Sequence, residues 1–284
     1  EGTPVVLRRA LAFEKILENM RIYMLPGELI VGNQANKPKA APLFPEFGVE
    51  WLSEELDQLP KRKFDSFRVS KETRKAVGTV IPYWRGKTHE DLVIEKTKYC
   101  LPETIRDAYS FKNYSLNQVI CNASHTSTGD GHIIADYEKI LNKGLDGIIS
   151  EVKMELLKID HTNREDLEKK LFLEAVIISC NAVILFANRF SNEAEKLARK
   201  YRGNRKDELL EIAEICRNVP AKPAGNFWEA LQAYWFVHLA LQIESNGHSI
   251  SFGRFDQILY PFYEKDKRQN LITREKALEL IECF

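Results

Sequence analysis

The spacing of apolar positions along the chain predicts a mainly helical protein. Over most of the sequence, apolar residues recur every three or four positions with charged residues between them. The helices predicted in this way cover residues 5–20, 51–59, 70–84, 88–100, 133–159, 164–201, 206–219 and 273–284. We expect helix 70–84 to stop near Pro82 and helix 133–159 to break at Gly144. Helix 164–201 is nearly all apolar in its middle, which predicts a central position in the fold.

One further helix has the clearest start signal in the chain. Asn226 is a favourable N-cap residue, and Glu229 stands three positions later, as in a capping box. Gly247 is the expected end of this helix. His238 lies on its apolar face, so we interpret this histidine as a hydrogen-bonded core residue.

Two short strands complete the predicted fold, which is mainly α with a few short strands. Residues 28–32 form an apolar run after a Pro-Gly turn, and residues 248–252 alternate between polar and apolar. Residues 36–49 contain three prolines, and residues 109–131 are polar and irregular. Because no repeat or flexible linker interrupts the sequence, we expect residues 1–284 to form a single unit.

Charge and composition narrow the classes of function. The chain has 41 basic and 41 acidic residues, a balance that argues against a nucleic-acid or anionic-membrane binder. The longest apolar runs without charge are 14 residues, 175–188 and 230–243, shorter than the ~20 that a membrane span needs, so a cytoplasmic location is expected. None of the five cysteines forms a Cys-x-x-Cys pair, which argues against a local zinc or iron–sulfur motif. Cys180 and Cys216 lie among apolar residues and are interpreted as buried and inert.

Two polar segments are candidates for chemistry. Residues 126–132 form a small-residue loop that ends in Asp130, Gly131 and His132; it is either a phosphate loop or a helix entry capped by Asp130. The phosphate reading is weakened because the loop has no Gly-Lys-Ser/Thr ending. Residues 244–249 follow a very apolar helix, and Glu244 and His248 are four positions apart. This spacing permits a metal site, but a helix end at Gly247 and the lack of a second His favour an ordinary turn.

The remaining histidines and charges have simpler interpretations. His89 and His161 sit among charged residues and are expected in solvent, and Arg254 and Asp256 are expected to form a structural pair. His132 and His248 are two candidates for chemistry. If they met in one polar pocket, it would suit a hydroxylated small molecule, since neutral imidazole both donates and accepts hydrogen bonds.

Residues 247–257, which read Gly-His-Ser-Ile-Ser-Phe-Gly-Arg-Phe-Asp-Gln, resemble the N-terminal half of glycyl radical enzymes of the pyruvate formate-lyase superfamily. The resemblance covers the whole chain. The other segments that carry it are 7–12, 28–32, 44–47 with Trp51, 83–84 with 86–88, 131–132 with 136–137, 243–246 and 260–264. The closest likeness is to the B12-independent glycerol and propane-1,2-diol dehydratases.

This resemblance implies a fold, a chemistry and a site. The family fold is a ten-stranded α/β barrel wrapped by helices, of which this chain is the N-terminal part. A thiyl radical takes hydrogen from a hydroxyl-bearing carbon, and the adjacent hydroxyl leaves as water. The resemblance assigns His132 and His248 to catalysis at the departing hydroxyl, and His132, His248 and Ser249 to substrate binding. It implies no metal site. A regular strand would point His248 and Ser249 to opposite faces. If both contact substrate, either the backbone bends there or one of them acts through its main chain.

The resemblance also implies groups outside this chain. None of the five cysteines stands in the family's Gly-Cys-Val-Glu context, and helix 273–284 ends at Phe284 without a glycine cap. We therefore expect a portion of a longer enzyme, truncated before the catalytic Cys and the radical Gly and inactive alone. The implied partners are a small-molecule substrate, an S-adenosylmethionine-dependent activase and a second copy of the chain. No cofactor is expected in the chain itself. The alternatives are a related enzyme that cleaves C–N, C–S or C–C bonds, a metal hydrolase, and a noncatalytic helical scaffold.

Overall fold

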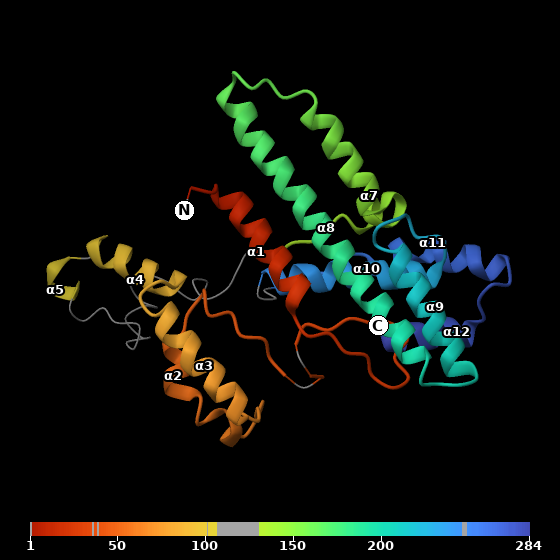
Figure 1. Cartoon of the computed structure of the whole chain (residues 1–284), viewed down its shortest axis with the longest axis horizontal. Helices are drawn as coiled ribbons and strands as arrows, with labels where there is room; N and C mark the ends of the chain where they lie inside the picture. The colour runs from red at the N-terminus through yellow and green to blue at the C-terminus, as the bar shows by residue number, and fades with distance from the viewer. Residues whose placement is uncertain (1, 36, 39, 101, 107–130, 246–248) are drawn as a thin grey trace. The chain divides into compact units, whose positions relative to one another are not determined.

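The structure is a computed structural model (Figure 1) that describes residues 2–35, 37–38, 40–100, 102–106, 131–245 and 249–284. Two compact units are present. The first contains residues 1–37, 132–244 and 249–284, and the second contains residues 38–131 and 245–248. Each unit is considered by itself, and the expectation of a single unit over residues 1–284 stays a prediction.

The first unit is built from helices, as the sequence predicted. They are α1 (Val5–Asn19), α7 (Tyr137–Leu156), α8 (Arg164–Ala198), α9 (Asn204–Asn218), α10 (Phe227–Glu244), α11 (Phe255–Arg268) and α12 (Arg274–Cys283). Helices α7 and α8 form an antiparallel hairpin, and α1 lies along α8 (Figure 1). The core lies where α8, α9 and α10 meet, around Phe186, Phe190 and Phe236, and none of these three side chains reaches solvent.

The boundaries of these helices follow from local hydrogen bonds. Helix α7 begins at Tyr137, four residues later than predicted, because Asp136 accepts the Lys139 N–H at 3.0 Å and caps it there. The break expected at Gly144 is present, with φ 66°. A Cβ at this position would lie 2.3 Å from the carbonyl oxygen of Ala221, so only glycine fits.

The second unit holds shorter helices: α2 (Glu50–Glu55), a 3-10 helix (Leu59–Lys61), α3 (Lys71–Trp84), α4 (His89–Cys100) and α5 (Glu103–Arg106). Thr88 and Asp91 form a reciprocal capping box at the start of α4, each side chain accepting the other's backbone N–H at 3.0 Å. Pro82 lies inside α3, which ends at Trp84, so the predicted end of this helix at residue 84, near Pro82, is confirmed.

The predicted strand 28–32 is wrong, and the structure shows why. Residues 29–31 are buried, but their backbone groups bond to side chains of α10 instead of to another strand. The Gln232 amide accepts the Val31 N–H and donates to the Val31 carbonyl, each at 2.8 Å. The Trp228 indole N–H donates to the Leu29 carbonyl at 3.0 Å. Residues 29–31 are therefore buried, and the backbone groups of Leu29 and Val31 have hydrogen-bond partners although no sheet forms. The described residues contain no β-strand, and the ten-stranded barrel stays a prediction.

Helix α10 begins as predicted, with one change in its capping bonds. Asn226 accepts the Glu229 N–H at 2.8 Å. Glu229 does not complete a standard capping box: it accepts the Gly225 N–H at 2.6 Å and the Asn218 side-chain amide at 2.9 Å. These bonds fix the start of the most deeply buried helix of the first unit.

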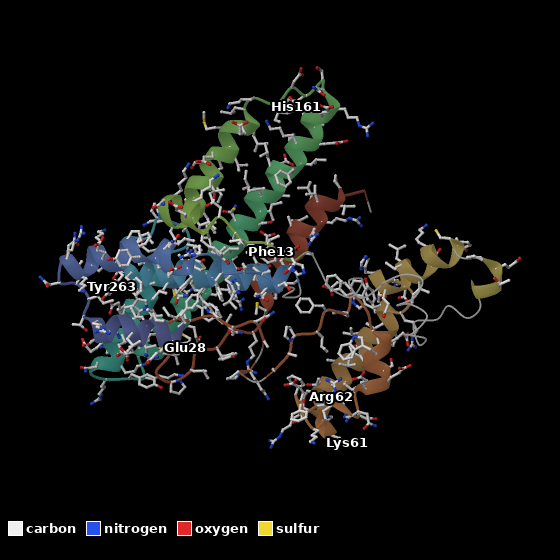
Figure 2. The ribbon with its side chains drawn as sticks, turned by 180° about the vertical axis from the view of Figure 1, so that it is seen from behind. Phe13, Glu28, Lys61, Arg62, His161 and Tyr263 are labelled. Atoms are coloured by element: carbon white, nitrogen blue, oxygen red, sulfur yellow. The ribbon has the colours of Figure 1, made fainter. Side chains whose placement is uncertain are left out.

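Helix α8 is, among the described residues, the one helix long and apolar enough to cross a membrane by length and composition. It packs against α1, α7 and α9, and Phe186, Ala187 and Phe190 on it are fully buried. A core helix passes the same test, and the packing identifies α8 as one. Phe13 of α1 is buried in the same core, whereas His161 lies at the tip of the α7–α8 hairpin, exposed as predicted (Figure 2).

Candidate functional site

Two segments that are distant in sequence meet at the N-terminal end of α7. The His132 N–H donates to the Ser249 carbonyl at 3.1 Å, and the Ser251 N–H donates to the Ile133 carbonyl at 3.0 Å. Ile134 and Ser251 form one isolated parallel bridge. The predicted strand 248–252 is therefore wrong as a strand: in its described residues only this bridge forms. The bridge nonetheless brings two of the three predicted site residues, His132 and Ser249, to one place.

Both residues at this junction have unusual backbone conformations. His132 has φ 57° and Ser249 has φ 53°, in the left-handed region that non-glycine residues rarely adopt. Such a conformation costs about 1–3 kcal/mol per residue and persists where surrounding structure imposes it, often at functional sites. The sequence argument allowed either a bend or a main-chain contact if His248 and Ser249 both contact one substrate, and Ser249 has the left-handed backbone of a bend. His248 itself lies outside the described residues.

Close approach of the two segments depends on a glycine. Gly253 has φ 63°, and a Cβ there would lie 2.9 Å from Cγ2 of Ile134. The Gly253 N–H donates to the Ser251 hydroxyl at 3.1 Å, which closes a tight turn. Ile250 points inward and is buried, while Ser249 and Ser251 are exposed. The junction thus presents polar groups on one side and packs on the core with the other.

An aromatic platform from α7 and α10 lies beneath the junction. The Tyr137 and Tyr234 rings stack with centroids 3.7 Å apart, and the His238 and Phe252 rings stack at 4.0 Å. The Tyr234 hydroxyl donates to the Phe252 carbonyl. Burial raises the pKa of Tyr234 to about 12, so its hydroxyl stays protonated and remains a donor. We call these four residues the aromatic platform.

His238 is the polar centre of this platform. Its Nδ1 lies 3.0 Å from the Tyr137 hydroxyl, and its Nε2 lies 3.1 Å from the Gln242 amide nitrogen. An amide nitrogen only donates, so Nε2 accepts, and Nδ1 carries the proton that it donates to Tyr137. Burial lowers the pKa of His238, which favours this neutral form. The prediction of a hydrogen-bonded core histidine is confirmed, since the residue is 5% exposed.

Glu244, which could have been a metal ligand with His248, forms an ion pair with Arg9 of α1. This pair joins the last residue of α10 to the start of the first unit. In the part of the chain that the structure describes, no three His, Cys, Asp or Glu side chains are grouped as metal ligands. The loop 126–130 lies outside the described residues, so the phosphate-loop interpretation stays a prediction. The predicted helix cap at Asp130 is wrong, because Asp136 caps the helix that follows.

Cys216 is buried as predicted, whereas Cys180 is only partly buried, so the prediction of a buried side chain is wrong for Cys180. Burial raises the pKa of Cys180 to about 11 and also raises that of Cys216, so both are thiols near neutral pH. Neither is an activated nucleophile. Cys100, Cys180, Cys216 and Cys283 are free of disulfides, and Cys121 lies outside the described residues.

A groove of about 530 Å³ lies between α7 and α11. Its lining includes Asn142, Arg254 and Lys265, but neither His132 nor Ser249. Arg254 forms a two-bond ion pair with Asp256, with N–O distances of 3.2 and 3.1 Å, as the structural reading predicted. Both side chains are exposed, so the pair contributes little to stability.

Several known proteins resemble this chain in sequence and in fold. The probable dehydratase YbiW of Escherichia coli (strain K12) is 39% identical over 284 residues, which are 98% of this chain and 33% of that protein. A structure solved for 1,2-propanediol dehydration in Roseburia inulinivorans aligns with a TM-score of 0.90 and 43% identity, over 100% of this chain and 33% of the solved one. The glycerol-bound B12-independent glycerol dehydratase from Clostridium butyricum aligns with a TM-score of 0.88 and 43% identity, over 99% and 34%.

The chain spans about a third of the length of the relatives it matches. A family model described as pyruvate formate lyase-like matches residues 1–284, the whole of the chain. The resemblance found in residues 247–257 and the segments collinear with them is therefore confirmed: this chain belongs to the pyruvate formate lyase-like family.

Proposed function

We propose that this chain is the N-terminal, substrate-pocket portion of a glycyl radical lyase that dehydrates a small diol or polyol, such as glycerol or propane-1,2-diol. Family membership and the 43% identity to two structures described by glycerol binding and propanediol dehydration support the proposal. The observation that carries it for this chain is the junction of His132 and Ser249. Two segments that the proposed site requires are joined there by backbone hydrogen bonds and held in uncommon conformations.

The proposed chemistry assigns a role to each polar group. His132 and His248 hydrogen-bond the departing hydroxyl, and Ser249 binds a substrate hydroxyl. Loss of a hydroxyl is difficult because hydroxide is a poor leaving group. An imidazole that donates to the leaving oxygen stabilises the charge that develops on it, which typically accelerates such a step by about 10²–10⁴-fold. His132 is exposed in this chain, as a group that must meet a ligand would be.

The radical chemistry is assigned to groups outside this chain. A glycyl radical, installed by an S-adenosylmethionine-dependent activase, supplies hydrogen abstraction through a cysteine. Cys180 and Cys216 do not suit that role, because they are packed inside helices with raised pKa values. The proposal includes a homodimer, a cytoplasmic location, no cofactor bound in this chain, and no nucleic-acid or membrane partner. The free thiols of the four described cysteines support a reducing compartment.

The test is turnover by the full-length protein that contains this chain, activated without oxygen by its activase. Loss of water from a 1,2-diol leaves an aldehyde, so aldehyde formation from glycerol and propane-1,2-diol is the expected result. Substrates that present a C–N, C–S or C–C bond beside the hydroxyl carbon form the comparison set. Turnover of one of these and not of diols would favour the related-lyase alternative, and no turnover of any would favour a scaffold.

The residue assignments need their own control. His132→Ala and His248→Ala are each expected to lower kcat by about 10²-fold or more in the full-length enzyme. His161→Ala is the matched control, because His161 is exposed at the tip of the α7–α8 hairpin (Figure 2) and is expected to leave turnover unchanged. Turnover within about twofold of the unmodified enzyme in His132→Ala would contradict the assignment.

A further inference from the structure

We propose that His238 is a positioning residue that holds the two segments carrying His132 and Ser249 in register. The catalytic consequence of this inference rests on the proposed function. Its structural consequence rests on the geometry alone. His238 touches neither His132 nor Ser249 in any contact described above. It acts through Tyr137 on one segment and through Phe252 on the other.

The contact with the first segment is a hydrogen bond. Tyr137 is the first residue of α7 and follows His132 by five positions. Its N–H donates to the Ala135 carbonyl at 2.8 Å, which turns the chain from the junction into the helix. The His238 Nδ1–H fixes the hydroxyl of this tyrosine at 3.0 Å, and the tyrosine side chain is 1% exposed. The end of segment 131–136 is thereby tied to α10.

The contact with the second segment is a ring stack supported by a hydrogen bond. Phe252 follows Ser249 by three positions, and its ring lies parallel to that of His238, with an interplanar angle of 23°. Its carbonyl accepts the Tyr234 hydroxyl. Tyr234 also stacks on Tyr137, so both segments rest on the same turn of α10. If either segment moved, it would lose its contacts with the Tyr234 and His238 side chains, which also hold the other segment.

Histidine is the residue type that can both donate a hydrogen bond to Tyr137 and stack its ring on Phe252. A phenylalanine at 238 would stack on Phe252 but could not bond to Tyr137, and a glutamine could bond but offers no ring face. Gln242, one turn further along α10, directs the proton to Nδ1 by donating to Nε2. The ring is thus kept neutral, with its single proton aimed at Tyr137.

The catalytic consequence follows from what positioning changes. A displaced His132 would still lie near bound substrate but would no longer align with the leaving oxygen in the transition state. Loss of such alignment lowers kcat more than it raises KM, because the interaction is realised in the transition state. Removing one partner of a buried hydrogen bond leaves the other partner unsatisfied. The cost corresponds to roughly a tenfold change in kcat or more if it falls on the transition state.

The test uses the full-length, activated enzyme and three variants. His238→Phe keeps the stack and removes the bond, and Tyr137→Phe removes the same bond by deleting one oxygen. Tyr260→Phe deletes a hydroxyl on the exposed face of α11 and is the matched control. The first two variants are each expected to lower kcat about tenfold or more and to change KM less than threefold. The kcat of the double variant should be no lower than that of the less active single variant, because both changes remove the same bond. Tyr260→Phe is expected to match the unmodified enzyme.

Hydrogen exchange of the same proteins gives a readout that needs no turnover. In His238→Phe and Tyr137→Phe, peptides covering 131–136 and 249–254 should exchange faster, because the His132 and Ser251 amides bond across the junction. A peptide from α9 should be unchanged. Unchanged exchange in both junction peptides, or kcat within about twofold of the unmodified enzyme, would overturn the inference. If His238→Phe fails to fold, Tyr137→Phe decides the outcome.

The two proposals fail differently. If the unmodified enzyme dehydrates no diol but both junction peptides exchange faster in the variants, the proposed function fails and the positioning role stands. If the unmodified enzyme dehydrates diols and the variants match it in both measurements, the proposed function stands and the positioning role fails.

Discussion

The N–H of His132 donates a hydrogen bond to the carbonyl of Ser249 at 3.1 Å, and both residues have a left-handed backbone. Each conformation is unfavourable for a residue with a Cβ. The bond therefore joins two residues that a regular helix or strand would not have placed there. The side chains of both are exposed in this chain, and both are proposed to meet substrate. The two residues with unfavourable backbone conformations are therefore the same residues that are proposed to bind substrate.

Ser249→Gly is expected to stabilise the protein while lowering its activity. Glycine adopts φ 53° without the Cβ penalty, so the free energy of unfolding should rise by up to about 1 kcal/mol. Turnover should fall because the proposed substrate hydrogen bond is lost. Thermal unfolding and diol turnover of the full-length protein measure the two effects.

Ser249→Ala is the control for this change, because it removes the same hydroxyl and keeps the Cβ. It should lose activity to the same extent as Ser249→Gly without the gain in stability. Equal stability of the two variants would show that the left-handed backbone at position 249 carries no cost.

Gly253→Ala is expected to destabilise the junction. The new Cβ would lie 2.9 Å from Cγ2 of Ile134, and φ 63° is unfavourable for alanine. We expect a loss of about 1–3 kcal/mol in the free energy of unfolding, measured by urea denaturation. Gly86→Ala is a matched control: its φ is 77°, but a Cβ there meets nothing within 4 Å, so it reports the backbone cost alone.

The steric part of the Gly253 effect can be separated further. Ile134→Ala removes Cγ2, and because Ile134 is 62% exposed this change should cost little by itself. In the double variant the clash is gone, so the loss should fall to about that of Gly86→Ala. Additive losses in the double variant would contradict a contact between these two positions.

The helices and their caps could be predicted from the sequence because their causes are local. Asn226 caps α10 as expected, Gly144 breaks α7 as expected, and Thr273 caps α12 by accepting the Lys276 N–H. Helix α11 was not predicted: it begins at Phe255, inside the segment 247–257 that carries the family resemblance. At the end of the chain, Phe284 packs on Phe255 with ring centroids 4.8 Å apart.

Both predicted strands failed for one physical reason. An apolar or alternating run indicates burial, but it does not say which groups will bond to its backbone. At Val31 the partner is the side-chain amide of Gln232, and at Ser251 it is a single residue of another loop. The same limit applies to the site. The roles of His132 and Ser249 were assigned from family resemblance. The apolar face of its helix indicated that His238 is hydrogen-bonded in the core, but not that Tyr137 is its partner.

Gln232→Leu tests the role of that amide in holding residues 29–31. The variant would leave the Val31 N–H and carbonyl buried without partners, at about 1–3 kcal/mol for each group. We expect a loss of about 2–5 kcal/mol in the free energy of unfolding by urea denaturation. Gln257→Leu, on the exposed face of α11, is the control and should change it by less than about 0.5 kcal/mol. A loss below 1 kcal/mol in Gln232→Leu would mean that water or another group satisfies Val31.

The stability of the protein should fall in mild acid because of His238. Burial lowers the pKa of its imidazole below the ordinary value of 6.5, so between these two values the unfolded chain binds a proton that the folded chain does not. Unfolding is therefore favoured as pH falls from the unfolded-state pKa to the folded-state pKa, and the contribution is fully present above 6.5. Protonation would also place a donor at Nε2 against the Gln242 amide nitrogen, which can only donate.

Other groups whose pKa values are shifted by burial also make stability depend on pH, so a difference measurement isolates the contribution of His238. Burial raises the pKa values of Glu28 and Glu90, and their contribution has the opposite sign. Subtracting the unfolding free energy of His238→Phe from that of the unmodified protein at each pH cancels them. The difference should decrease as pH falls below 6.5. A flat difference for His238 would show that the imidazole is protonated as easily in the folded protein as in the unfolded chain.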